Sequence, residues 1–93
     1  MTYKFLVHAK NDYVGVATDD IKKDETVKGA YLDSGKEVSV KAIEDITLGH
    51  KIALRDIKGG EKIIEYNEPV GQVAQDIRKG EHVHIHNIKT MRW

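Results

Sequence analysis

The chain repeats an eight-residue pattern, given by Asp20-Ile21-Lys22-Lys23-Asp24-Glu25-Thr26-Val27, Asp56-Ile57-Lys58-Gly59-Gly60-Glu61-Lys62-Ile63 and Asp76-Ile77-Arg78-Lys79-Gly80-Glu81-His82-Val83. A looser copy runs from Asp45 to Ile52. We name the copies, in chain order, the first to fourth Asp-Ile turns. Each offers a core isoleucine, a polar turn and the start of a strand. The aspartates are predicted to accept hydrogen bonds from turn amides rather than to act as general bases. The spacing is too irregular for a solenoid, so the repeat predicts recurrent turns in a convoluted sheet.

The residues between these turns alternate between apolar and polar types. Val38, Val40 and Ala42, for example, share one face of an expected strand, because successive strand side chains point in opposite directions. Strands are predicted over residues 3–8, 13–17, 26–32, 37–42, 51–54, 61–66, 70–74 and 81–88. No segment keeps a helical period long enough for a helix. The sequence therefore predicts an all-β fold of short twisted strands.

The bulk composition limits the possible functions. Ninety-three residues predict a single domain over 1–93, with residues 88–93 as a C-terminal tail. The chain has no cysteine, which excludes disulfides and thiolate metal sites. Its 15 basic and 15 acidic residues are mixed along the sequence, so we expect neither a nucleic-acid nor a membrane partner. No signal peptide is apparent, and a cytoplasmic protein is expected.

Three histidines alternate along the last predicted strand. On a strand, His82, His84 and His86 would project from one face, and such a pair of imidazoles can chelate a divalent metal. Asn87 and Lys89 follow, and an amide and a cation beside imidazoles suit a carboxylate substrate and its protons. The alternative is that this is the solvent face of an edge strand that is rich in histidine.

A second candidate pair lies in the second Asp-Ile turn. Gly49 allows a sharp change of direction and would present His50 and Lys51 at the start of a strand. The alternative interpretation is that both are ordinary exposed residues of a turn.

Several motifs together resemble a known family. They are Asn11-Asp12-Tyr13-Val14-Gly15-Val16-Ala17, Leu48-Gly49-His50-Lys51-Ile52-Ala53-Leu54, Gly60-Glu61 with Ile64 and Tyr66, and Gly80-Glu81-His82-Val83-His84-Ile85-His86-Asn87. In this order they resemble the small subunit of the altronate/galactarate dehydratase family, which is an SAF domain. The ending Asn87-Ile88-Lys89-Thr90-Met91-Arg92-Trp93 is similar to that of the sulfo-lyase members. The resemblance covers essentially the whole chain and implies a β-clip fold, as in antifreeze-like domains.

The resemblance also implies a role within a lyase. Family members eliminate water or sulfite from a hydroxy acid such as altronate, galactarate or sulfolactate. They are associated with a divalent metal (Fe²⁺ or Mn²⁺), which we expect the large catalytic subunit to hold in the main. The family pattern implies His50, Lys51, His84 and His86 as catalytic residues, with His84 and His86 also as metal ligands. It also falls on Asn87, which is expected to bind substrate, and His82 receives less weight. Lys89, like Lys51, could hold the substrate carboxylate as a cation.

Two other functions fit the same residues. The chain could be a non-catalytic SAF binding or assembly module that only shapes a large subunit. Ice binding follows from the fold analogy alone, and the highly charged surface without a flat, threonine-rich apolar face argues against it. The lyase interpretation further predicts that the isolated chain is inactive, because its residues do not form a complete metal site.

Overall fold

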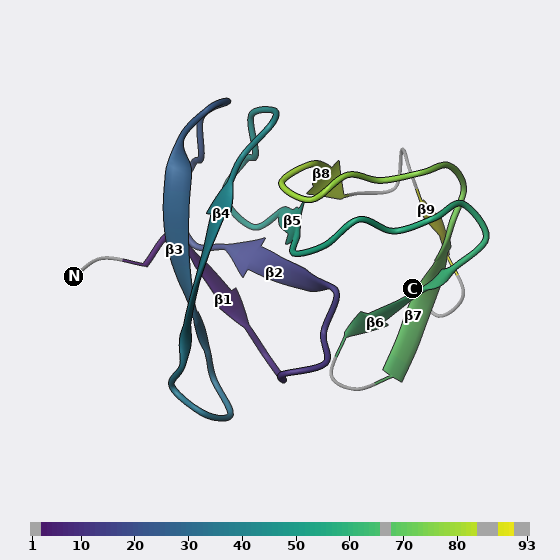
Figure 1. Ribbon diagram of the computed structural model, residues 1–93, viewed down its shortest axis with the longest axis horizontal. Coiled ribbons are helices and arrows are strands. Elements are labelled where there is room, and N and C mark those ends of the chain that lie inside the picture. Colours follow the sequence, from purple (N-terminus) through teal and green to yellow (C-terminus); the bar gives the residue numbers. More distant parts are fainter. Residues whose placement is uncertain (1–2, 66–67, 84–87, 91–93) are drawn as a thin grey trace.

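A computed structural model describes residues 3–65, 68–83 and 88–90, and these residues form strands and turns without a helix (Figure 1). The strands are β1 (Phe5–Val7), β2 (Val14–Ala17), β3 (Thr26–Tyr31), β4 (Glu37–Lys41), β5 (Lys51–Ala53), β6 (Lys62–Glu65), β7 (Glu68–Val73), β8 (His82–Val83) and β9 (Ile88–Thr90). The predicted all-β class is confirmed. Within the described ranges there is no helix long and apolar enough to span a membrane.

The described strands pair into two sheets. One sheet has the order β4-β3-β1-β2-β5-β8 and the other has the order β6-β7-β9. β1 and β3 pair in parallel, and every other described strand pair is antiparallel. In Figure 1, β3 and β4 lie at one end of the molecule, whereas β6, β7 and β9 lie at the other. β8 is the edge strand of the larger sheet on the side of the smaller one, and β5 lies beside it.

The core consists of two apolar clusters. One gathers Phe5, Val7, Ala17, Ile21, Val27, Val40, Ala42, Ile46 and Ile52, and the other gathers Val14, Ala53, Ile57, Ile63, Val73, Ile77 and Val83. The alternation predicted for residues 37–42 is present, because Val40 and Ala42 are buried and Val38 is half-buried. β5 contributes neighbouring residues to different clusters, Ile52 to the first and Ala53 to the second. This strand thus joins the two halves of the core.

The four Asp-Ile turns associate in two pairs. Ile21 of the first turn bridges Ile46 of the second, and Ile57 of the third bridges Ile77 of the fourth. All four isoleucines are 1% exposed. Burying an isoleucine side chain is worth about 1.5–3 kcal/mol, so these turns are anchors of the core as well as reversals of the chain.

Each turn aspartate binds the partner turn. Asp20 Oδ1 accepts a hydrogen bond from the Leu48 amide at 2.9 Å, and Asp45 Oδ1 accepts one from the Lys23 amide at 2.8 Å. The other pair repeats this exchange, with Asp56 bound to the Lys79 amide at 2.8 Å and Asp76 to the Gly59 amide at 2.7 Å. The prediction that these aspartates are turn acceptors is confirmed. The amide they bind belongs to the partner turn, a point that the local sequence did not reveal.

The fifth residue of every turn has a left-handed backbone. It is Asp24, Gly49, Gly60 or Gly80, with φ of 73°, 87°, 91° and 88°. Glycine adopts this conformation without strain, which explains its presence in three of the four turns.

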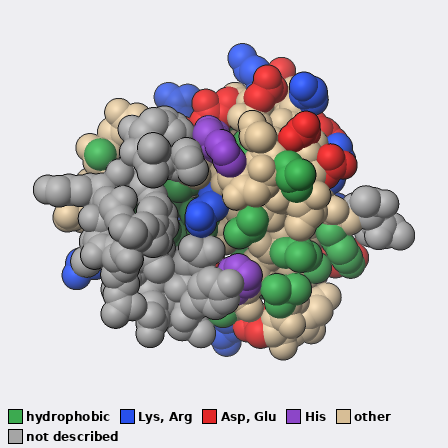
Figure 2. All heavy atoms as spheres, turned by 180° about the vertical axis from the view of Figure 1, so that it is seen from behind, with side chains coloured by type: hydrophobic (Ala, Val, Ile, Leu, Met, Phe, Trp, Pro, Cys, Tyr) green, Lys and Arg blue, Asp and Glu red, His purple; other side chains and the backbone are tan. Residues whose placement is uncertain are grey.

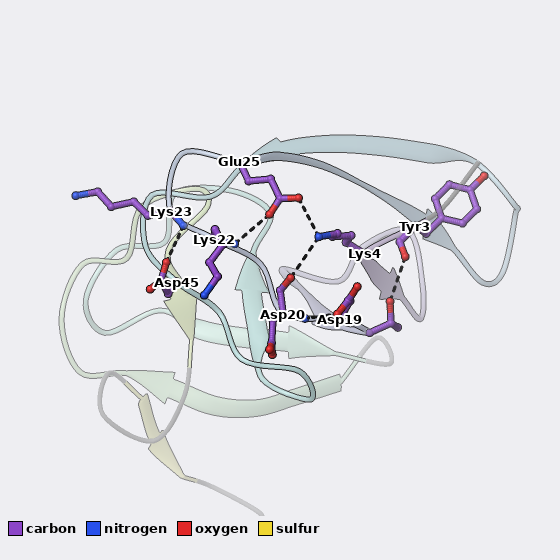
Figure 3. Close-up of polar contacts among 9 residues, drawn as sticks. Tyr3, Lys4, Asp19, Asp20, Lys22, Lys23, Glu25 and Asp45 are labelled. Atoms are coloured by element: carbon purple, nitrogen blue, oxygen red, sulfur yellow. Dashed lines mark hydrogen bonds and ion pairs between the residues drawn. The ribbon is translucent and has the colours of Figure 1, made fainter.

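The sixth residue fixes three of the turns. Glu25, Glu61 and Glu81 each accept a hydrogen bond, at 3.0 Å, from the backbone N–H three residues earlier. Figure 3 shows Glu25 between the Lys22 amide and the Lys4 ammonium, which lies 3.0 Å from the other carboxylate oxygen. The amide contact first, and Lys4 second, lower the pKa of Glu25. The carboxylate thus closes its own turn.

One predicted strand is described only in part. Of residues 81–88, His82 and Val83 form β8 in the larger sheet and Ile88 begins β9 in the smaller one, whereas 84–87 lie outside the described residues. Within the predicted tail, residues 88–90 form β9, which pairs with β7. The alternation of histidine and aliphatic residues fits a strand, but it does not show where the chain passes from one sheet to the other.

Candidate functional site

Two imidazoles meet where the second and fourth Asp-Ile turns enter their strands. His50 Nδ1 lies 2.7 Å from His82 Nε2, and the ring centroids are 4.9 Å apart with an angle of 13° between the ring planes. Both residues are half-buried. A neutral imidazole has one N–H donor and one acceptor nitrogen, so this contact requires one ring to donate and the other to accept. The two histidines therefore hold one proton between them at this point.

The strand register explains the contact. β5 and β8 are antiparallel, with Lys51 opposite Val83 and Ile52 opposite His82. Because the two strands are antiparallel, the start of β5 lies beside the end of β8, and His50, which immediately precedes β5, lies near that end. Val83 is fully buried, whereas its neighbour His82 is half-buried, as alternation on a strand requires.

His50 also occupies an exceptional position in the repeat. It is the sixth residue of its turn, where the other three turns have a glutamate that binds its own backbone. The His50 amide still donates to the Thr47 carbonyl at 2.9 Å, and the corresponding contacts in the other turns measure 2.9–3.0 Å. The turn therefore keeps its backbone shape, while its sixth side chain contacts the fourth turn instead.

The segment before the second turn contacts β8 as well. Glu44 Oε1 accepts a hydrogen bond from the His82 backbone amide at 2.7 Å, and Glu44 is half-buried. Lys51, also half-buried, follows His50 as the first residue of β5. Glu44 and the two histidines are thus linked at the β5–β8 pair, and Lys51 follows His50 in sequence. Figure 2 shows histidine side chains on the rear face of the molecule, beside hydrophobic and basic side chains.

The predicted site residues are described to different extents. Gly49, with φ of 87°, places His50 and Lys51 at the start of β5, as the sequence predicted. His84, His86 and Asn87 lie outside the described residues. The backbone of Lys89 is in β9 of the smaller sheet, and its side chain lies outside the description.

Among the described residues, the structure brings His82, which received less weight in the sequence, into contact with His50. The signal that could have drawn attention to the pair is the missing glutamate of the second turn, which leaves His50 as the exception among four related positions. The β5–β8 pairing that supplies His82 is not evident from the sequence.

The described residues do not form a complete metal site. Within ranges 3–65, 68–83 and 88–90, no group of three or more histidine, aspartate or glutamate side chains is placed to hold a metal ion. Catalytic metal sites usually have three protein ligands, whereas His50 and His82 together provide two imidazoles that are bonded to each other. The described part of the chain therefore offers proton-transfer groups rather than a full ligand set.

Comparison with known proteins gives consistent matches. The family model described as the altronate/galactarate dehydratase SAF domain matches residues 3–91. The (2R)-sulfolactate sulfo-lyase subunit alpha of Chromohalobacter salexigens is 38% identical over 94 residues, which cover 100% of both chains. The subunit alpha of Paracoccus pantotrophus is 49% identical over 49 residues, covering 53% of this chain and 73% of that protein. The altronate dehydratase of Bacillus subtilis is 44% identical over 86 residues, which cover 92% of this chain but only 16% of that protein.

Proposed function

Since the chain belongs to the altronate/galactarate dehydratase SAF domain family, we propose that it is the small subunit of a lyase that eliminates water or sulfite from a small hydroxy acid. The full-length similarity to a sulfo-lyase subunit alpha supports a two-subunit enzyme. In the Bacillus subtilis altronate dehydratase, the similar segment is a small part of a much longer chain. The large subunit would therefore correspond to the remainder of such a chain and would complete the site.

This class of elimination requires three catalytic functions: proton removal, stabilisation of negative charge and protonation of a hydroxide leaving group. A base removes the proton α to the carboxylate, the electron pair of that bond forms the C=C bond, and the leaving group departs from the β carbon as water or sulfite. The resulting enol then becomes a keto acid by proton transfer. The negative charge that develops on the carboxylate must be stabilised, and a hydroxide leaving group must be protonated.

The contact that carries this proposal is the 2.7 Å hydrogen bond between His50 and His82. Imidazole has an unperturbed pKa of about 6.5 and so exchanges protons readily near neutral pH. In the proposed complex His50 moves a proton to or from the substrate, and His82 positions its ring by holding Nδ1. Lys51, next to His50, supplies positive charge for the substrate carboxylate.

The remaining predicted residues extend this proposal beyond β8. His84 and His86 would face the seam with the large subunit, and Asn87 and Lys89 would contact the substrate. A divalent metal (Fe²⁺ or Mn²⁺), held in the main by the large subunit, would supply further positive charge at the carboxylate when bound. In this proposal His84 and His86 would contribute imidazole nitrogens to the metal.

The test is turnover of the complex between this chain and its large subunit. His50→Gln and His82→Gln should each lower kcat by about 100-fold or more, the usual contribution of a positioned acid or base. His8→Gln is the matched control, since His8 is also half-buried but lies after β1, away from the pair. It should leave turnover unchanged. His84→Ala and His86→Ala should also reduce turnover strongly.

The outcomes separate catalysis from assembly. If the complex forms and every histidine variant turns over as fast as wild type, the chain is a non-catalytic assembly module and the catalytic proposal fails. If no complex forms with the large subunit, the subunit proposal itself fails. Activity of the purified chain alone would contradict the proposal that the site is shared.

A further inference from the structure

A cleft of about 480 Å³ lies beyond the end of β5 that is opposite His50. It is lined by residues 10–13, 31, 54 and 55, and neither histidine of the pair is among them. The cleft brings together the loop after β1, the end of β3 and the residues after β5. The Leu54 amide donates to the Tyr13 carbonyl at 2.9 Å, which holds two of these segments together.

One cation of the cleft has a fixed orientation. The Arg55 guanidinium carbon lies 4.5 Å from the centre of the Tyr13 ring, and Arg55 Nε donates to the Asp56 carbonyl at 3.3 Å. A cation above an aromatic face is held by the electron density of the ring. The planar guanidinium carries further N–H donors at its terminal nitrogens, and their fork matches the two oxygens of a carboxylate. Arg55 is exposed, so an anion can approach it from solvent.

The charge balance of the lining is positive. Lys10 and Arg55 are both exposed, whereas the single lining acid, Asp12, is 5% exposed and accepts a hydrogen bond from the Ala9 amide at 3.3 Å. The Asp12 amide in turn donates to the Ala9 carbonyl at 3.0 Å, so this carboxylate belongs to its own loop. The half-buried Tyr13 and Tyr31 add phenol groups, which can donate neutral hydrogen bonds.

We propose that this cleft binds the oxyanion of a small acid, a carboxylate or a sulfonate, with Arg55 and Lys10 as its cationic contacts. The site is separate from the histidine pair. The three residues of β5 alone span about 10 Å at about 3.3 Å per residue, more than the length of a three-carbon acid. An acid held at Arg55 therefore does not reach His50. The cleft is a second acid site on the chain, and it does not depend on catalytic turnover.

The test uses the full chain alone and measures binding by amide chemical shifts. Tartrate supplies a carboxylate probe, isethionate a sulfonate probe and glycerol a neutral control, all at constant chloride concentration. Both acids should shift the amides of residues 10–13, 31 and 54–55 with a saturating dependence on concentration. Arg55→Gln and Lys10→Gln should each weaken binding by about tenfold, because each removes a charge-assisted contact.

Arg78→Gln is the matched control. Arg78 is also an exposed arginine, but it lines a second cleft, which Arg55 borders as well and where three acids, Asp56, Glu61 and Asp76, balance the three basic residues. It should bind both probes as wild type does. Equal affinity in Arg55→Gln and Arg78→Gln, or equal shifts with glycerol, would overturn the proposal. If Arg55→Gln fails to fold, Arg55→Lys provides the same test: it keeps the charge and loses the fork, so affinity should fall, and unchanged affinity would count against the site.

Discussion

Replacing His50 by glutamate (His50→Glu) would give the second Asp-Ile turn the residue that the other three turns carry at that position. The backbone is already suited to this change, because the His50 amide binds the Thr47 carbonyl at 2.9 Å, as the sixth residue does in the other turns. A glutamate at position 50 should accept the Thr47 amide hydrogen, and the corresponding contacts in the other turns are 3.0 Å long.

The expected change in stability is small. The new carboxylate contact should contribute about 0.5–1.5 kcal/mol, and the lost hydrogen bond between His50 and His82 should cost a similar amount. The free energy of unfolding should therefore stay within about 1 kcal/mol of wild type, which for a domain of this size means a Tm within about 8 °C.

The expected change in activity is large. A carboxyl group with a pKa of about 4.3 cannot replace an imidazole that exchanges protons near neutrality. In the complex with the large subunit, kcat should fall by about 10²–10⁴-fold, the range for loss of a general acid or base. Circular dichroism of the chain gives the Tm, and a turnover assay of the complex gives kcat.

The converse substitution is the control. Glu61→His places an imidazole at the sixth position of the third turn and removes its carboxylate contact, so it should cost about 1 kcal/mol of stability and leave turnover intact. Wild-type turnover in His50→Glu would refute the proposed role of the imidazole. A loss of more than about 3 kcal/mol would instead show that the second turn is not structurally equivalent to the others.

Two further pairs of variants test the fold and the proposed assembly. Gly80→Ala should destabilise the chain more than Gly60→Ala, although the φ values of 88° and 91° are nearly equal. In both variants the alanine has about 1–2 kcal/mol of left-handed backbone strain. Only the Cβ added at Gly80 would collide with a backbone carbonyl of β4. Equal losses of stability in thermal unfolding would contradict this reasoning. Leu48→Lys should weaken association with the large subunit, and Leu32→Lys should not. These leucines are 58% and 56% exposed, but only Leu48 lies in the turn that carries His50. Calorimetric titration measures both affinities, and equal losses would exclude the second turn as the contact.

Local features of the sequence predicted most of the fold. The period of two placed seven of the eight predicted strands close to their observed positions, since strand alternation is a property of neighbouring residues. The turn aspartates and the sharp bend at Gly49 followed from residue chemistry in the same way. The prediction of one strand over residues 81–88 did not indicate that β8 and β9 belong to different sheets, because their sheets are set by contacts with β5 and β7, which are distant in sequence.

For the same reason, the sequence did not predict the contact between His50 and His82. His50 could be recognised from its motif, but its partner His82 is 32 positions away and is brought close only by the pairing of β5 with β8. Contacts at such separation depend on which strands are neighbours, and alternation carries no information about that. The hydrogen bonds from each turn aspartate to the partner turn were not predicted either, because the paired turns are distant in sequence.

Among the four Asp-Ile turns, the copy whose sixth residue differs from the others indicates function most clearly. In three copies the sixth side chain is a glutamate that accepts a hydrogen bond from the backbone of its own turn, so it stabilises the fold. In the second copy the backbone holds the same shape without that contact, which means that the histidine is not required by the turn and needs another explanation. Since a departure from a local rule without local benefit is expected at functional sites, the position of His50 argues for selection by chemistry rather than by folding. A substitution at this position should therefore change turnover far more than stability, whereas a substitution at Glu61 should lower stability and leave turnover intact.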